Sequence, residues 1–323
     1  MNRISIGKWL IAFIFMSPIA CHRDLAPASS SVSPDYGYAG QWGGGGSGNG
    51  QFQSPTGIVQ DIHGKFYVTD TGNNRVEKFD SNGDYLGQWG AAGTGNGQFS
   101  GPTGIAIDSA GSRLYVTDIG NNRVQEFTTI GSYLGQWGGT GNGSGQFSYP
   151  KGLAVDAAGD VYVADSGNNR IQKFTSTGGY KTQWDGSGAS GGKFKDPSWV
   201  AIDSSGFVYI TDVYNYLIRK FKSDGTFINQ WGGSGGLECY CFCVSSGPDG
   251  LTVDLFGHVF VCDGGNARVE EFTATGQGVT TFGNTGSSNS LLADNQNLVI
   301  TLSGEIAVVD MNNNRIAFFK VQN

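Results

Sequence analysis

The apolar residues of this chain fall into short runs, each bounded by glycine, asparagine or aspartate. Near the beginning, four such runs cover residues 57–61, 65–70, 75–79 and 85–89. The residues between them tolerate positive φ angles and are typical of tight turns: Gly64, Gly72-Asn73-Asn74 and Asn82-Gly83. Short apolar runs separated by such turns predict four antiparallel β-strands.

This four-strand unit recurs six times. An aspartate ends the second run of every copy, and successive copies are 47 to 51 residues apart: Asp70, Asp118, Asp165, Asp212, Asp263 and Asp310. Four strands in about 45 residues is the unit of a β-propeller blade. Because one blade cannot bury both of its faces, the copies must pack around a common axis. The sequence therefore predicts an all-β, six-bladed β-propeller.

The two ends of the chain predict how the ring closes. The sixth copy stops after its third strand, 315–319, and lacks a fourth. Ahead of the first copy, Tyr38-Ala-Gly-Gln-Trp42 matches the fourth-strand sequence Tyr85-Leu-Gly-Gln-Trp89 at all positions but one. We expect the N-terminal strand to complete the last blade, which removes an exposed sheet edge.

The repeat resembles a known family. Residues 143–174 read GSGQFSYPKGLAVDAAGDVYVADSGNNRIQKF, which is similar to the NHL repeat. The resemblance covers residues 36–323 and implies a six-bladed propeller. It implies little about function, because one propeller fold supports many activities.

Composition agrees with this fold class. Of 323 residues, 54 are glycine, 15% are charged and 12% are aromatic. The aromatic content excludes a disordered polar chain, and the glycine content argues against a helical protein.

The first 35 residues are expected to lie outside the propeller. Residues 1–20 read as a signal peptide, with Arg3 and Lys8 ahead of an apolar run too short to span a bilayer. The sequence ending at Cys21 resembles the lipobox of bacterial lipoproteins, which implies acylation of Cys21; the alternative is an ordinary signal peptide cut after Ala20. Residues 21–35 are expected to form a flexible, lipid-anchored tether.

These segments predict a protein exported to the bacterial cell envelope and anchored by lipid at the outer membrane or cell surface. The full chain has a net charge of −7, and loss of the two basic residues with the signal peptide leaves −9. This charge argues against nucleic acid as a partner, so contact with the membrane is expected through the lipid anchor alone. The mature protein is expected to be a monomer.

The second-to-third-strand turns and the connectors between blades emerge on one face, here called the upper face. Its repeated turn motif Asp-x-Gly-Asn-Asn-Arg, as in Asp70 to Arg75, could form a charged ring around a ligand. The other interpretation, which we favour, is that identical residues in successive blades stabilise the turns.

Departures from the repeat gather in and after the fourth copy. There Trp199 replaces the glycine of Pro-x-Gly, and Leu217 replaces the turn arginine. An aromatic platform for a sugar or peptide would result on the upper face, although the same aromatics could simply pack together. The predicted platform consists of Trp199, Tyr214, Tyr216, Tyr240 and Phe242.

The middle residues of the Pro-x-Gly triplets should surround the opening of the central channel. They differ from blade to blade, as a binding site would require: Thr56, Thr103, Lys151, Ser198, Asp249 and Gln296. Among them, Lys151 and Asp249 are predicted to bind ligand.

Four cysteines beyond Cys21 suit disulfides in an exported protein, with a thiolate metal site as the alternative: Cys239, Cys241, Cys243 and Cys262. No cofactor, metal site or catalytic residue is predicted.

Enzymes related to this fold include an amidating lyase with zinc-bound histidines and streptogramin lyases that use histidine. Here the only histidines of the repeats, His63 and His258, are expected on the opposite, lower face. We therefore expect a non-catalytic binding or scaffold propeller whose upper face recognises a protein, peptide or glycan. The alternative is a calcium-assisted lyase or lactonase-like hydrolase acting at the channel mouth.

Overall fold

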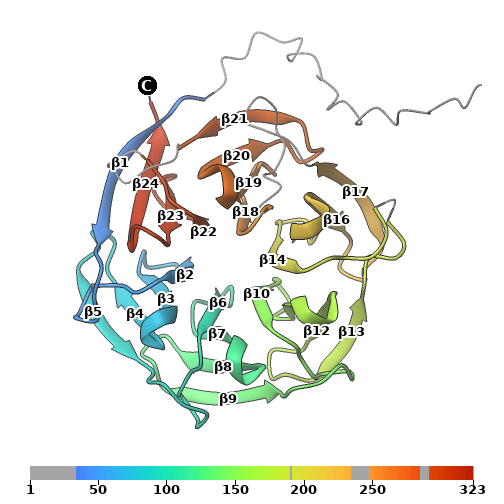
Figure 1. Ribbon diagram of the computed structural model, residues 1–323, viewed down its shortest axis with the longest axis horizontal. Helices are drawn as coiled ribbons and strands as arrows, with labels where there is room; N and C mark the ends of the chain where they lie inside the picture. The colour runs from blue at the N-terminus through green and yellow to red at the C-terminus, as the bar shows by residue number, and fades with distance from the viewer. Residues whose placement is uncertain (1–33, 190, 234–246, 284–290, 323) are drawn as a thin grey trace, which may run out of the picture. The chain divides into compact units, whose positions relative to one another are not determined.

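The computed structural model describes residues 34–189, 191–233, 247–283 and 291–322. These residues form six four-stranded antiparallel sheets arranged as the blades of a propeller (Figure 1). The predicted all-β, six-bladed fold is confirmed.

The first three blades each use four consecutive strands. Blade one contains β2 (Pro55–Gln60), β3 (Phe66–Asp70), β4 (Arg75–Phe79) and β5 (Tyr85–Trp89). Blade two contains β6 (Pro102–Ile107), β7 (Arg113–Asp118), β8 (Arg123–Thr128) and β9 (Tyr133–Gly138). Blade three contains β10 (Pro150–Val155), β11 (Val161–Asp165), β12 (Arg170–Phe174) and β13 (Tyr180–Trp184).

The next two blades repeat this order, and the sixth contributes three strands. Blade four contains β14 (Pro197–Ile202), β15 (Val208–Asp212), β16 (Leu217–Phe221) and β17 (Phe227–Gly232). Blade five contains β18 (Leu251–Val253), β19 (Val259–Asp263), β20 (Arg268–Phe272) and β21 (Gly278–Phe282). Blade six contains β22 (Asn295–Ile300), β23 (Ile306–Asp310) and β24 (Arg315–Val321).

Short 3-10 helices form the upper-face turns of the first five blades. They are η1 (Thr71–Asn73), η2 (Ile119–Asn121), η3 (Ser166–Asn168), η4 (Val213–Asn215) and η5 (Gly264–Asn266). No helix among the described residues is long and apolar enough to cross a membrane.

Strand β1 (Tyr36–Gly43) closes the ring, as the sequence predicted. It pairs antiparallel with β24, from Tyr36 opposite Val321 to Gly43 opposite Arg315. Figure 1 shows β1 along the outer edge of blade six, beside β24. The edge that β24 would otherwise expose is thereby covered, and both ends of the described chain are fixed in one sheet.

The hydrophobic core is divided among the six junctions between blades. Each of six buried clusters combines side chains of two neighbouring blades. At the closing junction, the Trp42 ring of β1 lies 4.4 Å from the Phe79 ring of blade one. One phenylalanine from each of the connectors that precede blades one to four is buried in such a junction: Phe52, Phe99, Phe147 and Phe194. Blade-to-blade burial therefore holds the ring together, since no blade has a core of its own.

Candidate functional site

The repeated aspartate and arginine of the upper-face turns are scaffold residues. In blade one, Arg75 Nε donates to Asp70 Oδ2 at 2.7 Å, and its terminal nitrogens donate to carbonyl groups of connector 47–51. The same pairing, at 2.7 to 3.2 Å, occurs in four other blades: Arg123–Asp118, Arg170–Asp165, Arg268–Asp263 and Arg315–Asp310. These side chains are buried. The scaffold interpretation is confirmed, because these charged groups pair with one another and, in blade one, with the connector.

The second asparagine of each motif connects neighbouring blades. Asn74 adopts the left-handed conformation with φ 56°, and its Oδ1 accepts from the N–H of Gly101 in blade two at 2.8 Å. Three further junctions have the same bond: Tyr149 N–H to Asn122, Asp196 N–H to Asn169 and Ser54 N–H to Asn314. Tyr216 and Ala267 replace this asparagine in blades four and five. The regular bridge is therefore lost at the junctions on either side of blade five.

Blade four keeps its buried arginine at a different position. Leu217 stands where the other blades have arginine, but Arg219, two residues along β16, forms the ion pair with Asp212 at 2.8 Å. Residues two apart on a strand share a face, so the guanidinium still reaches the turn. Arg219 is fully buried and donates to the carbonyl oxygens of connector 191–192.

The predicted aromatic platform is only partly gathered. Trp199 is 6% exposed and belongs to the core cluster between blades four and five. Tyr216 is half-buried against that cluster, whereas Tyr214 projects from the upper-face turn with 61% exposure. Tyr240 and Phe242 lie outside the described residues. Trp199 thus follows the packing alternative, and Tyr214 is the accessible aromatic of the described set.

The glycine that Trp199 replaces has a steric role in other blades. A Cβ atom on Gly57 would lie 2.5 Å from the Thr103 carbonyl oxygen, and one on Gly104 equally close to that of Lys151. The innermost strands of neighbouring blades therefore touch through these glycines. This contact brings the middle residues of successive Pro-x-Gly triplets close to one another in space.

Charged groups meet where the innermost strands of blades three to six begin. Lys151 Nζ lies 2.8 Å from Asp196 Oδ2, and both side chains are partly exposed. Gln296 Nε2 donates to Asp294 Oδ1 at 2.7 Å. Thr56 and Ser198, in contrast, are buried. We call the group Lys151, Asp196, Asp249, Asp294 and Gln296 the mouth cluster.

Two carboxyl groups of the mouth cluster face each other above Gly264. Asp249 Oδ2 and Asp294 Oδ1 lie 2.8 and 3.3 Å from the point that a Cβ atom of Gly264 would occupy. The two oxygens are therefore within about 6 Å of each other, close enough for mutual repulsion.

The protonation of this pair reflects its surroundings. Burial raises the pKa of the Asp249 carboxyl to about 8, with Lys151 opposing the rise and Asp294 adding to it. Burial also raises the pKa of Asp294, against the hydrogen bond from Gln296. Near neutral pH Asp249 consequently retains a proton that an ordinary aspartate would have lost.

Two asparagines beside the pair were missed by the sequence analysis. Blade six has Asn295-Gln296-Asn297 where the earlier blades begin Pro-x, and both asparagines are buried. The Oδ1 atoms of Asn295 and Asn297 have no hydrogen-bond partner in the described part of the chain. The loss of both proline and glycine from one triplet was the available signal.

The remaining candidates lie elsewhere. His258 is in the lower-face turn of blade five, with Nδ1 3.0 Å from Glu271 Oε1, and His63 is in the equivalent turn of blade one. Cys262 is a free, buried thiol, and burial raises its pKa. Cys239, Cys241 and Cys243 lie outside the described residues. Within the described ranges, no group of three or more histidine, cysteine, aspartate or glutamate side chains is arranged to hold a metal ion.

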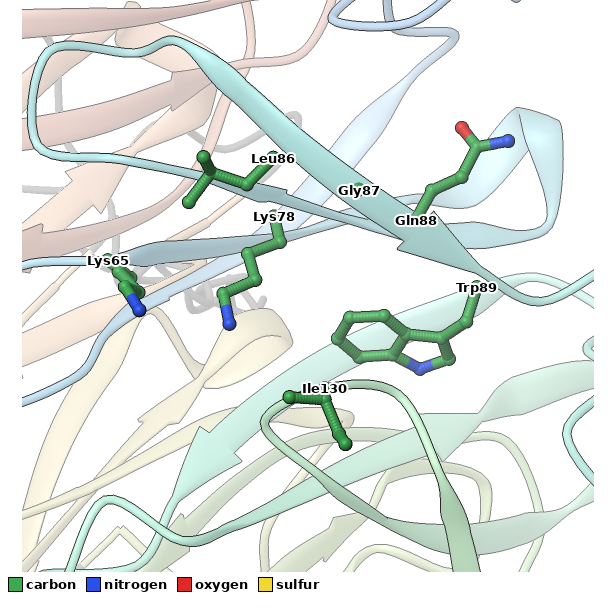
Figure 2. Close-up of a pocket in the computed structure, with 7 residues that line it drawn as sticks. All are labelled: Lys65, Lys78, Leu86, Gly87, Gln88, Trp89 and Ile130. Carbon is green, nitrogen blue, oxygen red and sulfur yellow. The ribbon is translucent and has the colours of Figure 1, made fainter.

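A shallow groove of about 230 Å³ lies between blades one and two, away from the predicted site residues. Figure 2 shows Lys78, Trp89 and Ile130 around the same space. Lys78 Nζ donates to the Thr129 carbonyl at 2.8 Å, so its ammonium already has a partner. The groove adds no chemistry to the mouth cluster.

Sequence profiles agree with this architecture. The NHL repeat profile matches residues 147–174, and a profile described as 6-bladed beta-propeller matches residues 54–127. The protein is a six-bladed β-propeller that contains an NHL repeat. No curated protein matches its sequence.

Solved structures resemble this NHL-repeat propeller in fold. A streptogramin B lyase aligns with TM-score 0.59 and 13% identity, over 82% of this chain and 78% of that one. A catalytically inactive virginiamycin B lyase from Staphylococcus aureus with quinupristin aligns with TM-score 0.57 and 15% identity, over 89% and 100%. A protein of unknown function from Bacteroides thetaiotaomicron aligns with TM-score 0.67 and 16% identity, over 89% and 76%. At such identities the likeness establishes the fold alone.

Proposed function

We propose that this propeller is a non-catalytic binding module of the bacterial envelope, anchored by lipid on Cys21. Its upper face captures a protein or peptide segment that carries a cationic group, such as a lysine side chain or an amino terminus. The observation that carries the proposal is the pair Asp249 and Asp294, held together at the mouth with raised pKa values.

The charges at the mouth favour a cation. Lys151 forms its ion pair with Asp196 and acts on Asp249 only at longer range, and among the described residues neither Asp249 nor Asp294 forms an ion pair of its own. A ligand ammonium between them would replace the lost hydration and lower both pKa values. The adjoining asparagine oxygens without partners can accept further hydrogen bonds from the same segment.

The position of the pair also supports a binding role. Asp249 is in blade five and Asp294 in blade six, at a junction without the regular asparagine bridge. The asparagine bridge that connects other neighbouring blades is thus absent where the distinctive polar groups gather. Tyr214, exposed on the same face in blade four, offers an aromatic contact to a longer ligand.

The test uses two synthetic decapeptides, one rich in lysine and its counterpart with glutamate. At pH 9, where Asp249 is ionised, we expect the lysine peptide to bind in calorimetry and the glutamate peptide not to bind. Asp249→Asn with Asp294→Asn should weaken binding at least about tenfold, since ligand charges lose their buried partners. Asp224→Asn, at an exposed turn, is the matched control. Equal binding of both peptides, or capture of glycans alone, would contradict the proposal.

The anchor and the enzymatic alternative have separate tests. Cys21→Ser should move the protein from the membrane fraction to the soluble fraction, because the acylated residue is lost. A calcium-assisted lyase or hydrolase would instead be favoured by stoichiometric calcium or zinc in elemental analysis of the purified protein.

A further inference from the structure

Large apolar side chains project into solvent from the lower face. Those in first-to-second-strand turns are Ile62, Leu255, Phe256 and Leu302, with exposures from 58% for Ile62 to 88% for Leu255; Ile130, 80% exposed, lies apart from them in a third-to-fourth-strand turn of blade two. We call these four residues the lower-face patch. All belong to first-to-second-strand turns of blades five, six and one, which follow one another around the closed ring (Figure 1).

The fold does not require these side chains. In blade five, Asp254 Oδ1 forms the turn by accepting from the N–H groups of Phe256 and His258 at 2.8 and 2.7 Å. Blade three forms the same turn with Asp156 and two alanines. The corresponding turn positions of blades two to four carry only small residues: Ser109, Ala110, Ala157, Ala158, Ser204 and Ser205. Apolar groups exposed beyond the need of the fold indicate an interaction surface.

The chain enters the propeller beside this patch. Tyr36, the first residue of β1, pairs with Val321 at the lower end of the blade. Its ring stacks on Phe282 with centroids 4.5 Å apart, and its hydroxyl is hydrogen-bonded to Glu271, the partner of His258. The described chain therefore begins at the lower face, next to the blade-five turn that carries Leu255 and Phe256. Val321, half-exposed at the same place, extends the apolar surface.

The length of the segment before Tyr36 indicates that a membrane surface covers the lower-face patch. Fourteen residues lie between Cys21 and Tyr36, and a flexible chain of that length spans about 20 Å on average. A lipid on Cys21 would thus hold the lower face within reach of the bilayer, while the upper face has no such tether. The mature chain's charge of −9 favours zwitterionic over anionic lipid.

We propose that the lower-face patch rests in the interface of the membrane that holds the Cys21 acyl chains. This inference rests on the lipid anchoring proposed above and adds a second membrane contact to it. The acyl chains supply attachment, and the patch supplies orientation. With blades five, six and one on the bilayer, the mouth cluster opens toward the aqueous side, where a peptide segment can reach it.

The test places a fluorescent reporter on each face of the lipidated full chain. Phe256→Trp puts an indole in the patch, and Tyr214→Trp puts one at an exposed position of the upper face. Both variants are reconstituted in phosphatidylcholine and phosphatidylethanolamine vesicles with brominated acyl chains. We expect the emission added by Phe256→Trp to be quenched and shifted to shorter wavelength, and that added by Tyr214→Trp to be unchanged. Quenching of both added indoles to the same extent, or quenching of neither, would overturn the proposal.

A second arm does not depend on the lipid anchor. Two proteins are floated with the same vesicles made without bromine. One carries Cys21→Ser alone, and the other carries Cys21→Ser together with Leu255→Ser and Phe256→Ser. The fraction bound to vesicles should be about tenfold lower, or lower still, for the protein with the two serine substitutions. Each large apolar side chain contributes at least about a factor of ten to the affinity when it is buried. Leu134→Ser, an exposed leucine of strand β9, is the control and should bind as the parent does. Thermal unfolding confirms that all variants fold.

The outcomes separate the two proposals. If Leu255→Ser and Phe256→Ser leave flotation unchanged, or if the protein does not float at all, the proposed membrane contact of the lower-face patch is refuted. The proposed peptide site is not affected by this result, because peptide binding is measured in solution. Self-association that these two substitutions abolish, with no vesicle binding, would assign the patch to contact between copies of the chain. A soluble wild-type protein whose patch still binds vesicles would refute lipid anchoring alone.

Discussion

The relocated arginine of blade four permits a quantitative test of how the upper-face turns are stabilised. Arg219→Gln removes the cation 2.8 Å from Asp212 and leaves the glutamine that blade three has at this position, Gln172. Asp212 keeps two hydrogen bonds, from the Lys195 N–H and Asn215 Nδ2. Its buried charge nevertheless loses its counter-ion.

The expected cost follows from this geometry. Removing one partner of a buried ion pair typically destabilises by about 3–5 kcal/mol. Because the two remaining hydrogen bonds still solvate the Asp212 carboxylate, we expect a value near the lower limit. For a domain of this size the melting temperature should fall by about 6–12 °C.

A second substitution should reverse much of the loss. Leu217→Arg, added to Arg219→Gln, restores the order of blade three, in which Arg170 pairs with Asp165. It also supplies a donor for Gln230 Oε1, a buried atom without a hydrogen-bond partner among the described residues. In blade three the equivalent atom, Gln183 Oε1, accepts from Arg170 at 2.9 Å.

Urea unfolding at pH 7, followed by tryptophan fluorescence, measures all three proteins. The reasoning requires the single variant to be least stable and the double variant to recover at least half of the lost free energy. A loss below about 1 kcal/mol in Arg219→Gln would mean that the ion pair is not a stabilising element. A double variant no more stable than the single one would show that the arginine position, and not its charge, is what matters.

Three further predictions concern ring closure, the mouth and the buried thiol. Trp42→Ala removes the ring packed against Phe79 and should destabilise by about 3 kcal/mol in urea unfolding, with a loss under 1 kcal/mol as the contrary result. The Asp249 pKa is raised to about 8 when folded and is about 4 when unfolded, so the folded state holds the extra proton and loses stability as pH rises between these values. The free energy of unfolding of Asp249→Asn should therefore increase relative to that of the wild type from pH 5 to pH 9. A difference between the two free energies that stays constant over this range would disprove the raised pKa. Cys262, whose pKa burial raises, should resist iodoacetamide at pH 8 until urea unfolds the protein, as peptide mass mapping can show.

Several features could be derived from the chain alone because they depend on local pattern. The 47-residue period of the aspartates determined the number of blades, and the match of residues 38–42 to 85–89 determined how the ring closes. The scaffold role of Asp70 and Arg75 also followed from their repetition, since a residue needed in every blade serves what every blade shares.

Other features required the tertiary structure because they depend on contacts between blades. Asp249 and Asp294 are 45 residues apart in sequence, and only the touching inner strands of blades five and six bring their carboxyl groups together. Leu217 was interpreted as a lost arginine, whereas Arg219 reaches Asp212 from the same face of its strand. Trp199 suggested a ligand platform but fills the core between two blades. A repeat pattern specifies the strands and turns within each blade. The burial and the pKa of a side chain depend instead on the neighbouring blade, which is about 47 residues distant in the chain.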